Sequence, residues 1–278
     1  MEIFRIQKDN GHFVSCVKEI PPDPRVIVIA IHGFSSSRDC STYQMLLRRL
    51  PPEGCGVIGI ELPGHGSAES LQETLRIENA LDSIAAAEKY AAEHYPGTEI
   101  CYFASSFGAY LTGLYLSGRE HRGRRAFFRS AAVNMPSLFL KEHPTEESRR
   151  QREELREKGW FDAAVETGKP VRITREMLRD LEENDLFARF DPSAHGENRV
   201  MMVHGAEDSV IDPEAARAFA ERFRIPIRFF ENEGHSLGDH PETPDRVADL
   251  ALAFFTCDLP ENDLRTETGI RPNEPKAD

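Results

Sequence analysis

The chain has 278 residues with 47 acidic and 34 basic side chains, which gives a formal net charge of −13 at pH 7. Charge of this sign argues against nonspecific binding to nucleic acid and against anchoring on anionic lipid. With 40% hydrophobic residues, the chain can fill the core of one large α/β domain that carries an insertion.

The N-terminal residues predict a β-hairpin rather than a leader segment. Residues 1–8 lack the apolar core and the small-residue cleavage site of a signal peptide. Apolar residues flank Asn10-Gly11, a favoured hairpin turn, so we expect a hairpin over residues 2–19. No apolar run in the chain approaches transmembrane length, and no membrane anchor is expected.

The rest of the chain alternates predicted strands with predicted helices. Short apolar, β-branched runs are typical of strands that are buried on both faces of a sheet. They occur at residues 26–31, 57–60, 100–104, 131–134, 200–204 and 227–230. Helical spacing of apolar residues predicts helices at 41–50, around 81–92 and at 247–255. This alternation predicts an α/β fold with a mostly parallel central sheet flanked by helices.

Residues 137–192 break the alternation and predict a small helical cap between the fourth and fifth parallel strands. Residues 146–158 are almost wholly charged, and residues 174–183 have the apolar side of a short helix. No buried strand is expected here. The only tryptophan, Trp160, is followed by Phe161, and we expect this pair to wall a substrate pocket. The alternative is a surface excursion without a function.

These patterns predict three parts of the chain. The α/β core is expected over residues 1–136 and 193–257, and the cap over residues 137–192. Residues 258–278 contain three prolines and many charges, which predicts a polar C-terminal tail with little packed structure.

The most informative pattern lies at residues 100–116. An apolar, β-prone run ends at Ala104, Ser106 follows two places later, Gly108 two places after that, and an apolar helix pattern continues the chain. This is the layout of a nucleophile elbow, in which a serine occupies a sharp strand-to-helix turn. Ser236 lies in a literal G-x-S-x-G at residues 234–238, but charged residues precede it and two prolines follow. The context therefore favours Ser106 as the nucleophile.

A serine hydroxyl needs a base to take its proton, and the base needs a carboxylate to orient it. Asp208 comes just beyond one predicted buried strand, and His235 just beyond the next. Carboxyl ends of parallel strands share one edge of the sheet, where open α/β folds place their sites. The chain order Ser106, Asp208, His235 matches the order expected for this kind of site.

Other residues remain open for the same roles. Glu207 and Asp212 are alternative acids, and His240 is the leading alternative to His235. His204 is expected to pack beside the site, and His195 to lie in a solvated connector.

An oxyanion intermediate needs two N–H donors. The backbone of Phe107, directly after the nucleophile, is one candidate. The other is the backbone of Phe34, in the loop after the first buried strand. The ring of Phe34 and the side chain of Ser105 are expected to line the substrate pocket with Trp160 and Phe161. The alternative for His32-Gly33 is a turn without a catalytic role.

Five motifs in this order resemble the α/β-hydrolase family over residues 1–256: His32-Gly33-Phe34, Glu61-Leu62-Pro63-Gly64-His65-Gly66-Ser67, residues 104–108, residues 204–208 and Gly234-His235-Ser236. Within that family, the short cap after the sixth strand is similar to bacterial cinnamoyl/feruloyl esterases and to monoacylglycerol-lipase-like relatives. The resemblance implies Ser106, Asp208 and His235 as a catalytic triad, with the amides of Phe34 and Phe107 as oxyanion hole.

Two positions depart from the family pattern. Ala104 replaces the first glycine of the elbow, and Glu61 stands where an aspartate is common. Both changes are compatible with catalysis, because the family tolerates the first and the Glu61 loop is chiefly structural. The charged cap leaves the substrate open.

The five cysteines are odd in number, scattered and without a C-x-x-C pair, which fits a reduced, cytoplasmic setting. We expect no metal and no cofactor.

The expected function is a serine hydrolase that cleaves small-molecule carboxylic esters, aromatic or short-acyl, through an acyl-enzyme. The same three side chains would also serve a thioesterase, an amidase or peptidase, or a C–C hydrolase. A noncatalytic ligand-binding protein is the alternative from another class.

Overall fold

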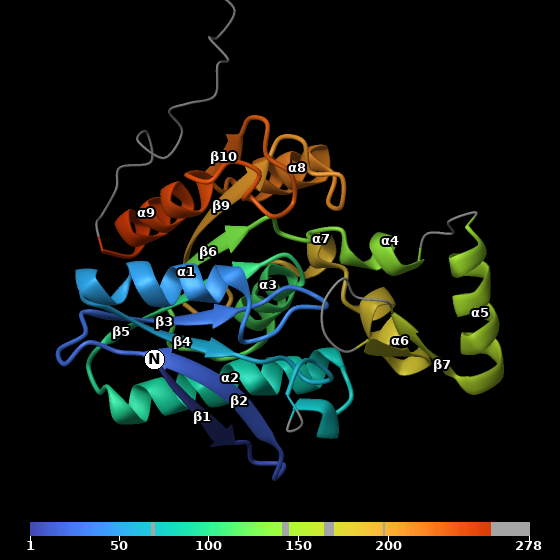
Figure 1. Cartoon of the computed structure of the whole chain (residues 1–278), viewed down its shortest axis with the longest axis horizontal. Coiled ribbons are helices and arrows are strands. Elements are labelled where there is room, and N and C mark those ends of the chain that lie inside the picture. The colour runs from blue at the N-terminus through green and yellow to red at the C-terminus, as the bar shows by residue number, and fades with distance from the viewer. Residues whose placement is uncertain (68–69, 141–144, 164–169, 197, 257–278) are drawn as a thin grey trace, which may run out of the picture.

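A sheet of eight strands forms the middle layer of the fold (Figure 1). The computed structural model describes residues 1–67, 70–140, 145–163, 170–196 and 198–256, so the predicted tail at 258–278 lies outside the described residues. The strand order is β1-β2-β4-β3-β5-β6-β9-β10. The strands are β1 (Glu2–Gln7), β2 (Phe13–Glu19), β3 (Val26–Ile31), β4 (Cys55–Ile60), β5 (Glu99–Ser105), β6 (Arg125–Arg129), β9 (Arg199–Gly205) and β10 (Ile227–Phe230).

The first two strands form the predicted hairpin and are antiparallel to each other, and β2 is antiparallel to β4. Gly11 sits in the turn with φ of 87°, a conformation that glycine adopts without strain. All other neighbouring strands of the sheet are parallel. The predicted fold class, a mostly parallel sheet flanked by helices, is therefore confirmed.

Helices cover both faces of the sheet and bury its apolar side chains (Figure 1). One face packs against α1 (Ser41–Arg49) and α9 (Thr243–Thr256). The other packs against α2 (Ile77–His94), α3 (Phe107–Gly118) and α8 (Pro213–Phe223). β3 and β4 are buried at every position, because helices cover them on both sides. Two 3-10 turns, Pro51–Glu53 and Ser70–Gln72, lie in the connections.

The fourth parallel strand was expected at 131–134, and that prediction is wrong. The strand is β6, Arg125–Arg129, and its charged ends conceal the buried centre made by Ala126, Phe127 and Phe128. Residues 131–134 form a buried loop instead, in which the Ala132 amide donates to the carbonyl of Ser106 at 3.2 Å. Their apolar character reflects burial beneath the elbow rather than a strand.

The insertion between β6 and β9 lies beyond the edge toward which β3 and β4 point (Figure 1). It comprises α4 (Met135–Leu140), α5 (Glu146–Lys158), β7 (Trp160–Ala163), β8 (Val171–Thr174), α6 (Arg175–Glu183) and α7 (Leu186–Arg189). The expectation that it holds no buried strand is wrong, because β7 and β8 pair antiparallel and bury alternate side chains. Four-residue strands are too short to give a clear alternation in sequence.

The cap is fixed to the core by polar contacts at α6. The Arg76 guanidinium donates twice to the Asp180 carboxylate, at 2.5 and 2.7 Å, and the Ile77 amide donates to the same carboxylate at 3.2 Å. The Tyr110 hydroxyl of α3 donates to the carbonyl of Asn184 at 2.7 Å. Paired, two-point arginine contacts fix orientation as well as distance.

Candidate active site

Ser106 occupies a sharp turn between β5 and α3. Its φ of 52° and ψ of −117° are unusual for a residue with a side chain, and such strain persists only where the surroundings enforce it. The amide of Ser106 donates to the carbonyl of Arg129 at 2.9 Å, which ties the turn to β6. Gly108 follows, and a Cβ there would lie 2.5 Å from the carbonyl oxygens of Ile31 and His32. The small residue at this place therefore lets α3 approach the end of β3.

Ser106, His235 and Asp208 lie within hydrogen-bonding distance of one another in series. His235 Nε2 is 3.0 Å from Ser106 Oγ, and His235 Nδ1 is 2.8 Å from Asp208 Oδ2. Since the carboxylate can only accept, Nδ1 carries the proton, and Nε2 of a neutral ring is then free to accept from the serine hydroxyl. The structure thus brings together the three side chains that the sequence singled out.

The Asp208 carboxylate is buried and fully occupied by donors. Its Oδ1 accepts from the amides of Val210 and Ile211, both at 2.9 Å. Its Oδ2 lies 3.1 Å from His204 Nε2, in addition to its contact with His235. Burial on its own raises the pKa of Asp208, but the hydrogen bonds from the two histidines outweigh burial and hold this pKa well below its usual range. The carboxylate is therefore charged at neutral pH.

His204 lies in β9 beside the site, as expected. Its Nε2 is also 3.2 Å from the carbonyl of Ile211, so both neighbours of this nitrogen are acceptors and Nε2 carries the proton. His204 Nδ1 is buried and has no hydrogen-bond partner among the described residues. The contact of His204 with Asp208 was not foreseen, because it depends on how the loop 206–211 folds back.

Two buried groups hold the loop that carries His235. The Ser130 hydroxyl donates to the backbone carbonyl of His235 at 2.9 Å. The Glu233 carboxylate accepts from the amides of Asp239 and His240, at 3.0 and 3.1 Å, and so closes the loop after the histidine. Burial raises the pKa of Glu233, but hydrogen bonds from Thr243 and these amides outweigh burial and lower the pKa. Sequence reasoning missed both groups, although Glu233 stands only two residues before His235.

Two buried histidines brace the loop after β3. His32 donates through Nδ1 to the carbonyl of Gly33 at 2.7 Å and accepts the Leu62 amide at Nε2 at 3.0 Å. His65 donates through Nδ1 to the carbonyl of Pro63 at 2.9 Å and accepts the Ser35 amide at 3.2 Å. These roles require neutral rings.

Burial favours the neutral form of both rings. It lowers the pKa of His32 to about 4 and that of His65 to about 3. Both rings are therefore uncharged across the neutral range. They link the loop after β3 to the one after β4.

The loop after β3 lies directly against Ser106. A Cβ on Gly33 would be 3.1 Å from Cβ of Ser106 and 3.7 Å from its Oγ. The next amide along the chain is that of Phe34, and the amide of Phe107 opens α3 on the other side of Ser106. Neither amide donates a hydrogen bond to another group of the described residues. Both are available to a ligand at the serine.

An aromatic cluster borders the serine. The Phe34 ring makes edge-to-face contacts with Phe107, His65 and Phe139, with centroid distances of 6.1, 5.7 and 5.0 Å. Phe139 belongs to α4, so the cap contributes to this cluster. The sequence analysis did not name it, although it stands in the apolar run 135–140 that follows the fourth parallel strand.

The remaining pocket candidates lie in different surroundings. Trp160 is in β7, where the Arg172 guanidinium stacks over its ring at 3.6 Å, so its closest partners are inside the cap. Phe161 is buried in the large core cluster. Ser105 ends β5 with a buried Oγ that has no partner among the described residues.

The alternative residues lie away from the hydrogen-bonded series. Asp212 is exposed and caps α8 by accepting the Glu214 amide at 3.0 Å. Glu207 is exposed, and His240 is bound to Glu233 at 3.0 Å. Ser236 is exposed in a turn and is not followed by a helix.

In the described part of the chain, no group of three or more histidine, cysteine or acidic side chains is arranged to hold a metal ion. None of the described helices is both long and apolar enough to span a bilayer.

Comparisons with known proteins agree with this architecture. The model of the Alpha/beta hydrolase family matches residues 28–250, and the chain therefore belongs to that family. No curated protein matches the sequence.

Solved structures with the same fold include two enzymes whose names state an activity or a ligand. Est1E from Butyrivibrio proteoclasticus, solved with bound ferulic acid, is 18% identical with a TM-score of 0.74, over 90% of this chain and 98% of that chain. A monoacylglycerol lipase from Paleococcus ferrophilus is 17% identical with a TM-score of 0.63, over 92% and 98%. The mouse Alpha/beta hydrolase domain-containing protein 10 is 13% identical with a TM-score of 0.68, over 90% and 97%. At these identities the likeness establishes the fold.

Proposed function

We propose that the protein is a serine hydrolase that cleaves carboxylic esters through an acyl-enzyme intermediate. The observation that carries this proposal is the unbroken series from Asp208 through His235 to Ser106, with contacts of 2.8 and 3.0 Å. A base within reach of a serine hydroxyl, itself oriented by a carboxylate, is the arrangement that activates serine as a nucleophile.

In the first half of the reaction, Ser106 Oγ attacks the ester carbonyl carbon while its proton moves to His235 Nε2. The carbonyl oxygen becomes an oxyanion, which the amides of Phe34 and Phe107 stabilise by donating hydrogen bonds. When the intermediate collapses, the bond to the alcohol oxygen breaks. His235 Nε2–H gives its proton to that oxygen, and the acyl group stays on Ser106.

In the second half, water replaces the alcohol. His235 Nε2 takes a proton from the water, whose oxygen attacks the acyl carbon, and a second oxyanion forms between the same two amides. Collapse breaks the bond to Ser106 Oγ, which recovers its proton from His235. Asp208 remains ionised throughout and stabilises the imidazolium that forms twice in each cycle.

The surroundings of the serine favour an ester with an apolar group beside the reacting bond. The half-buried Phe34 and Phe139 present aromatic rings there, the buried Phe107 packs against Phe34, and the two braced histidines add no charge. The ferulic acid bound to Est1E and the name of the Paleococcus lipase are consistent with ester substrates of aromatic or aliphatic acids. Aromatic acyl esters match the ring cluster best.

Active-site labelling with a fluorophosphonate tests the proposal directly. We expect the probe to modify the peptide that carries Ser106, and Ser106→Ala to abolish labelling and to lower ester turnover by about 10⁴- to 10⁶-fold. Ser236→Ala is the matched control, since that serine sits in the literal G-x-S-x-G of an exposed turn, and it should keep full activity. Labelling at Ser236, or none anywhere, would overturn the assignment.

A substrate panel then tests the reaction class. Aryl, short-chain and long-chain nitrophenyl esters should all be cleaved, with the aryl esters fastest because of the ring cluster. Inertness toward every ester, together with turnover of a peptide anilide or an acyl thioester, would replace the esterase by one of the other reactions that this arrangement can perform.

A further inference from the structure

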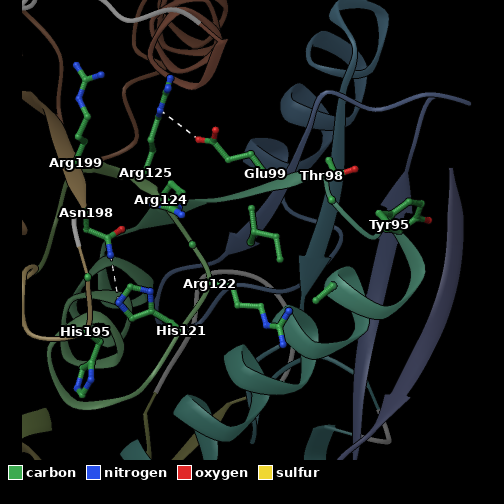
Figure 2. A pocket seen from close by; sticks show the side chains of 15 residues that line it. Tyr95, Thr98, Glu99, His121, Arg122, Arg124, Arg125, His195, Asn198 and Arg199 are labelled. Atoms are coloured by element: carbon green, nitrogen blue, oxygen red, sulfur yellow. Dashed lines mark hydrogen bonds and ion pairs between the residues drawn. The ribbon is translucent and has the colours of Figure 1, made fainter.

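A second site candidate lies at the opposite edge of the sheet, where β5, β6 and β9 begin. A groove of about 840 Å³ opens there between the connections that lead into these three strands (Figure 2). β5 has seven residues, so its amino end is about 20 Å from Ser106 at about 3.3 Å per residue. We refer to this feature, lined by Arg122, Arg124, Arg125 and Arg199, as the basic groove.

The charge of the basic groove is opposite to that of the protein. The whole chain carries −13, whereas four arginines and one carboxylate, Glu99, line this groove among the residues that the structure describes. Arg125 is partly engaged, since its Nε lies 3.3 Å from Glu99 and its guanidinium donates to the carbonyl of Phe254 at 2.8 Å. Gathering cations in a concave surface focuses a positive potential that attracts anions.

Two of the arginines lack a protein counter-ion. Arg122 and Arg124 are exposed, and their guanidinium groups make no ion pair or hydrogen bond with any residue that the structure describes. On the rest of the surface, Arg76 and Arg119 are paired with carboxylates, whereas the exposed Arg149 is not paired within the described part of the chain. Arg122 and Arg124 differ from an isolated surface arginine such as Arg149 in that both line the same groove.

The backbone that carries these arginines is held in position. The Asn198 amide, oriented by its network, donates to the carbonyls of Gly123 and Arg124 at 3.2 and 3.3 Å and accepts from His121 Nε2 at 3.2 Å. The Arg124 amide donates to the carbonyl of Ile100 at 2.9 Å. A Cβ on Gly123 would lie 2.0 Å from the buried Tyr102 ring, so glycine lets this segment pack closely. The arginines are thus presented by a fixed backbone.

The arrangement of the arginines indicates the size of the ligand. Arg124 lies in the middle of the groove, Arg125 and Arg199 extend on the side of α9, and Arg122 extends on the side of α2 (Figure 2). Arg124 and Arg122 therefore offer two separate guanidinium groups to a ligand, one for each of two anionic groups. A volume of about 840 Å³ is within the range of sites for small organic ligands, about 300–1,000 Å³.

We propose that the basic groove binds a small organic molecule that carries two or more phosphate groups. Guanidinium groups match phosphate because they donate two parallel hydrogen bonds to its oxygens and stay charged at every physiological pH. Arg124 and Arg122 contact the phosphates directly. The site is separate from Ser106 and does not depend on the proposed ester hydrolysis.

Calorimetric titration of the 278-residue chain tests the proposal, with inorganic phosphate, inorganic pyrophosphate and ADP as probes. We expect saturable binding in the order ADP and pyrophosphate tighter than phosphate. Arg122→Gln and Arg124→Gln should each weaken binding of pyrophosphate about tenfold, because each removes charge-assisted hydrogen bonds. Arg149→Gln, an exposed arginine of α5 outside the groove, should bind as the unsubstituted protein does.

Several outcomes would contradict the proposal. They are no saturable binding at millimolar ligand, equal affinity for phosphate and pyrophosphate, or equal weakening by Arg149→Gln and Arg124→Gln. An acidic peptide that displaces pyrophosphate at lower concentration than ADP does would assign the groove to a protein segment instead, and would also overturn it. Because Ser106→Ala should bind ADP normally, failure here is distinguishable from failure of the esterase assignment.

Discussion

Polar side chains at the two edges of the central sheet differ in burial and in hydrogen bonding. At the carboxyl edge, Asp208, His32 and His65 are each at most 5% exposed, and each is held by hydrogen bonds within the protein. At the amino edge, Arg122 and Arg124 are exposed, and their guanidinium groups make no hydrogen bond or ion pair with the described part of the chain. The polar side chains of the carboxyl edge are thus buried and hydrogen-bonded to one another or to the backbone, whereas these two arginine side chains of the amino edge are exposed to solvent and unpaired among the described residues.

The difference in burial determines what each edge can do. Hydrogen bonds in a buried network fix the position of a reacting group before the substrate arrives, which is what a short-lived transition state requires. Exposed charges bind and release a ligand readily, but they do not fix reacting atoms. Substitutions at the carboxyl edge should therefore have large effects on activity or folding, and those in the basic groove should affect ligand binding alone.

The largest effect is expected from Asp208→Asn. The amide keeps the size of the side chain but can donate to His235 Nδ1 and so favour the wrong tautomer, and kcat/KM for an ester should fall about 10⁴-fold. Asp212→Asn is the matched control, because asparagine also caps α8 well and the residue is exposed. Steady-state kinetics on both variants measures this. Similar losses of kcat/KM in the two variants would mean that Asp208 does not orient His235 for catalysis.

The sequence was sufficient for the fold class and for the residues that meet at Ser106, and the reason is local. Ser106 directly follows β5, Asp208 comes three residues after β9, and His235 comes five residues after β10. These strands are visible in the sequence as short apolar runs. A parallel sheet then brings their carboxyl ends together. The site residues could therefore be predicted without predicting any contact between side chains that are distant in sequence.

What the sequence did not indicate depends on contacts between distant segments. The Arg125 and Arg129 ends of β6 conceal a strand in the sequence, and the apolar loop 131–134 resembles one. Ser130 gains its role only because the His235 carbonyl lies 2.9 Å away. The basic groove likewise combines residues 122–125 with Arg199, which no sequence spacing relates.

Acidification should loosen the carboxyl edge. In the unfolded chain a histidine has a pKa of about 6.5, whereas burial lowers the pKa of His32 to about 4 and that of His65 to about 3. The unfolded state therefore binds more protons below pH 6.5. The stability contributed by the neutral rings is complete above that pH and is lost as the pH falls toward the folded values.

Between pH 7 and pH 5 the loss should be about 2 kcal/mol for each ring, or about 4 kcal/mol together. Urea denaturation at the two pH values measures it. His65→Gln removes one titrating ring, so the difference between pH 7 and pH 5 should shrink by about half, whatever the variant loses at pH 7. An unchanged difference would contradict burial as the cause.

Gly108→Ala tests how tightly α3 is packed against the end of β3. The new Cβ would lie 2.5 Å from two backbone oxygens that cannot rotate away, so we expect a loss of about 3 kcal/mol in unfolding free energy. Gly118→Ala, at the other end of the same helix, meets nothing within 4 Å and should gain up to about 1 kcal/mol. Equal shifts in the denaturation midpoint would show that the approach is looser than these distances imply.

The smallest expected effect isolates the strain at the elbow. Ser106→Gly and Ser106→Ala both remove the hydroxyl and its contact with His235, so both should be inactive to a similar degree. They differ only in the Cβ, which is unfavourable at a φ of 52°. Glycine should therefore be more stable than alanine by about 1 kcal/mol, even though glycine loses more entropy on folding. Denaturant midpoints of the pair give this difference without assumptions about the lost hydrogen bond. If the alanine variant were the more stable of the two, the backbone at residue 106 would not be strained, and hydrogen bonds alone would hold the elbow in place.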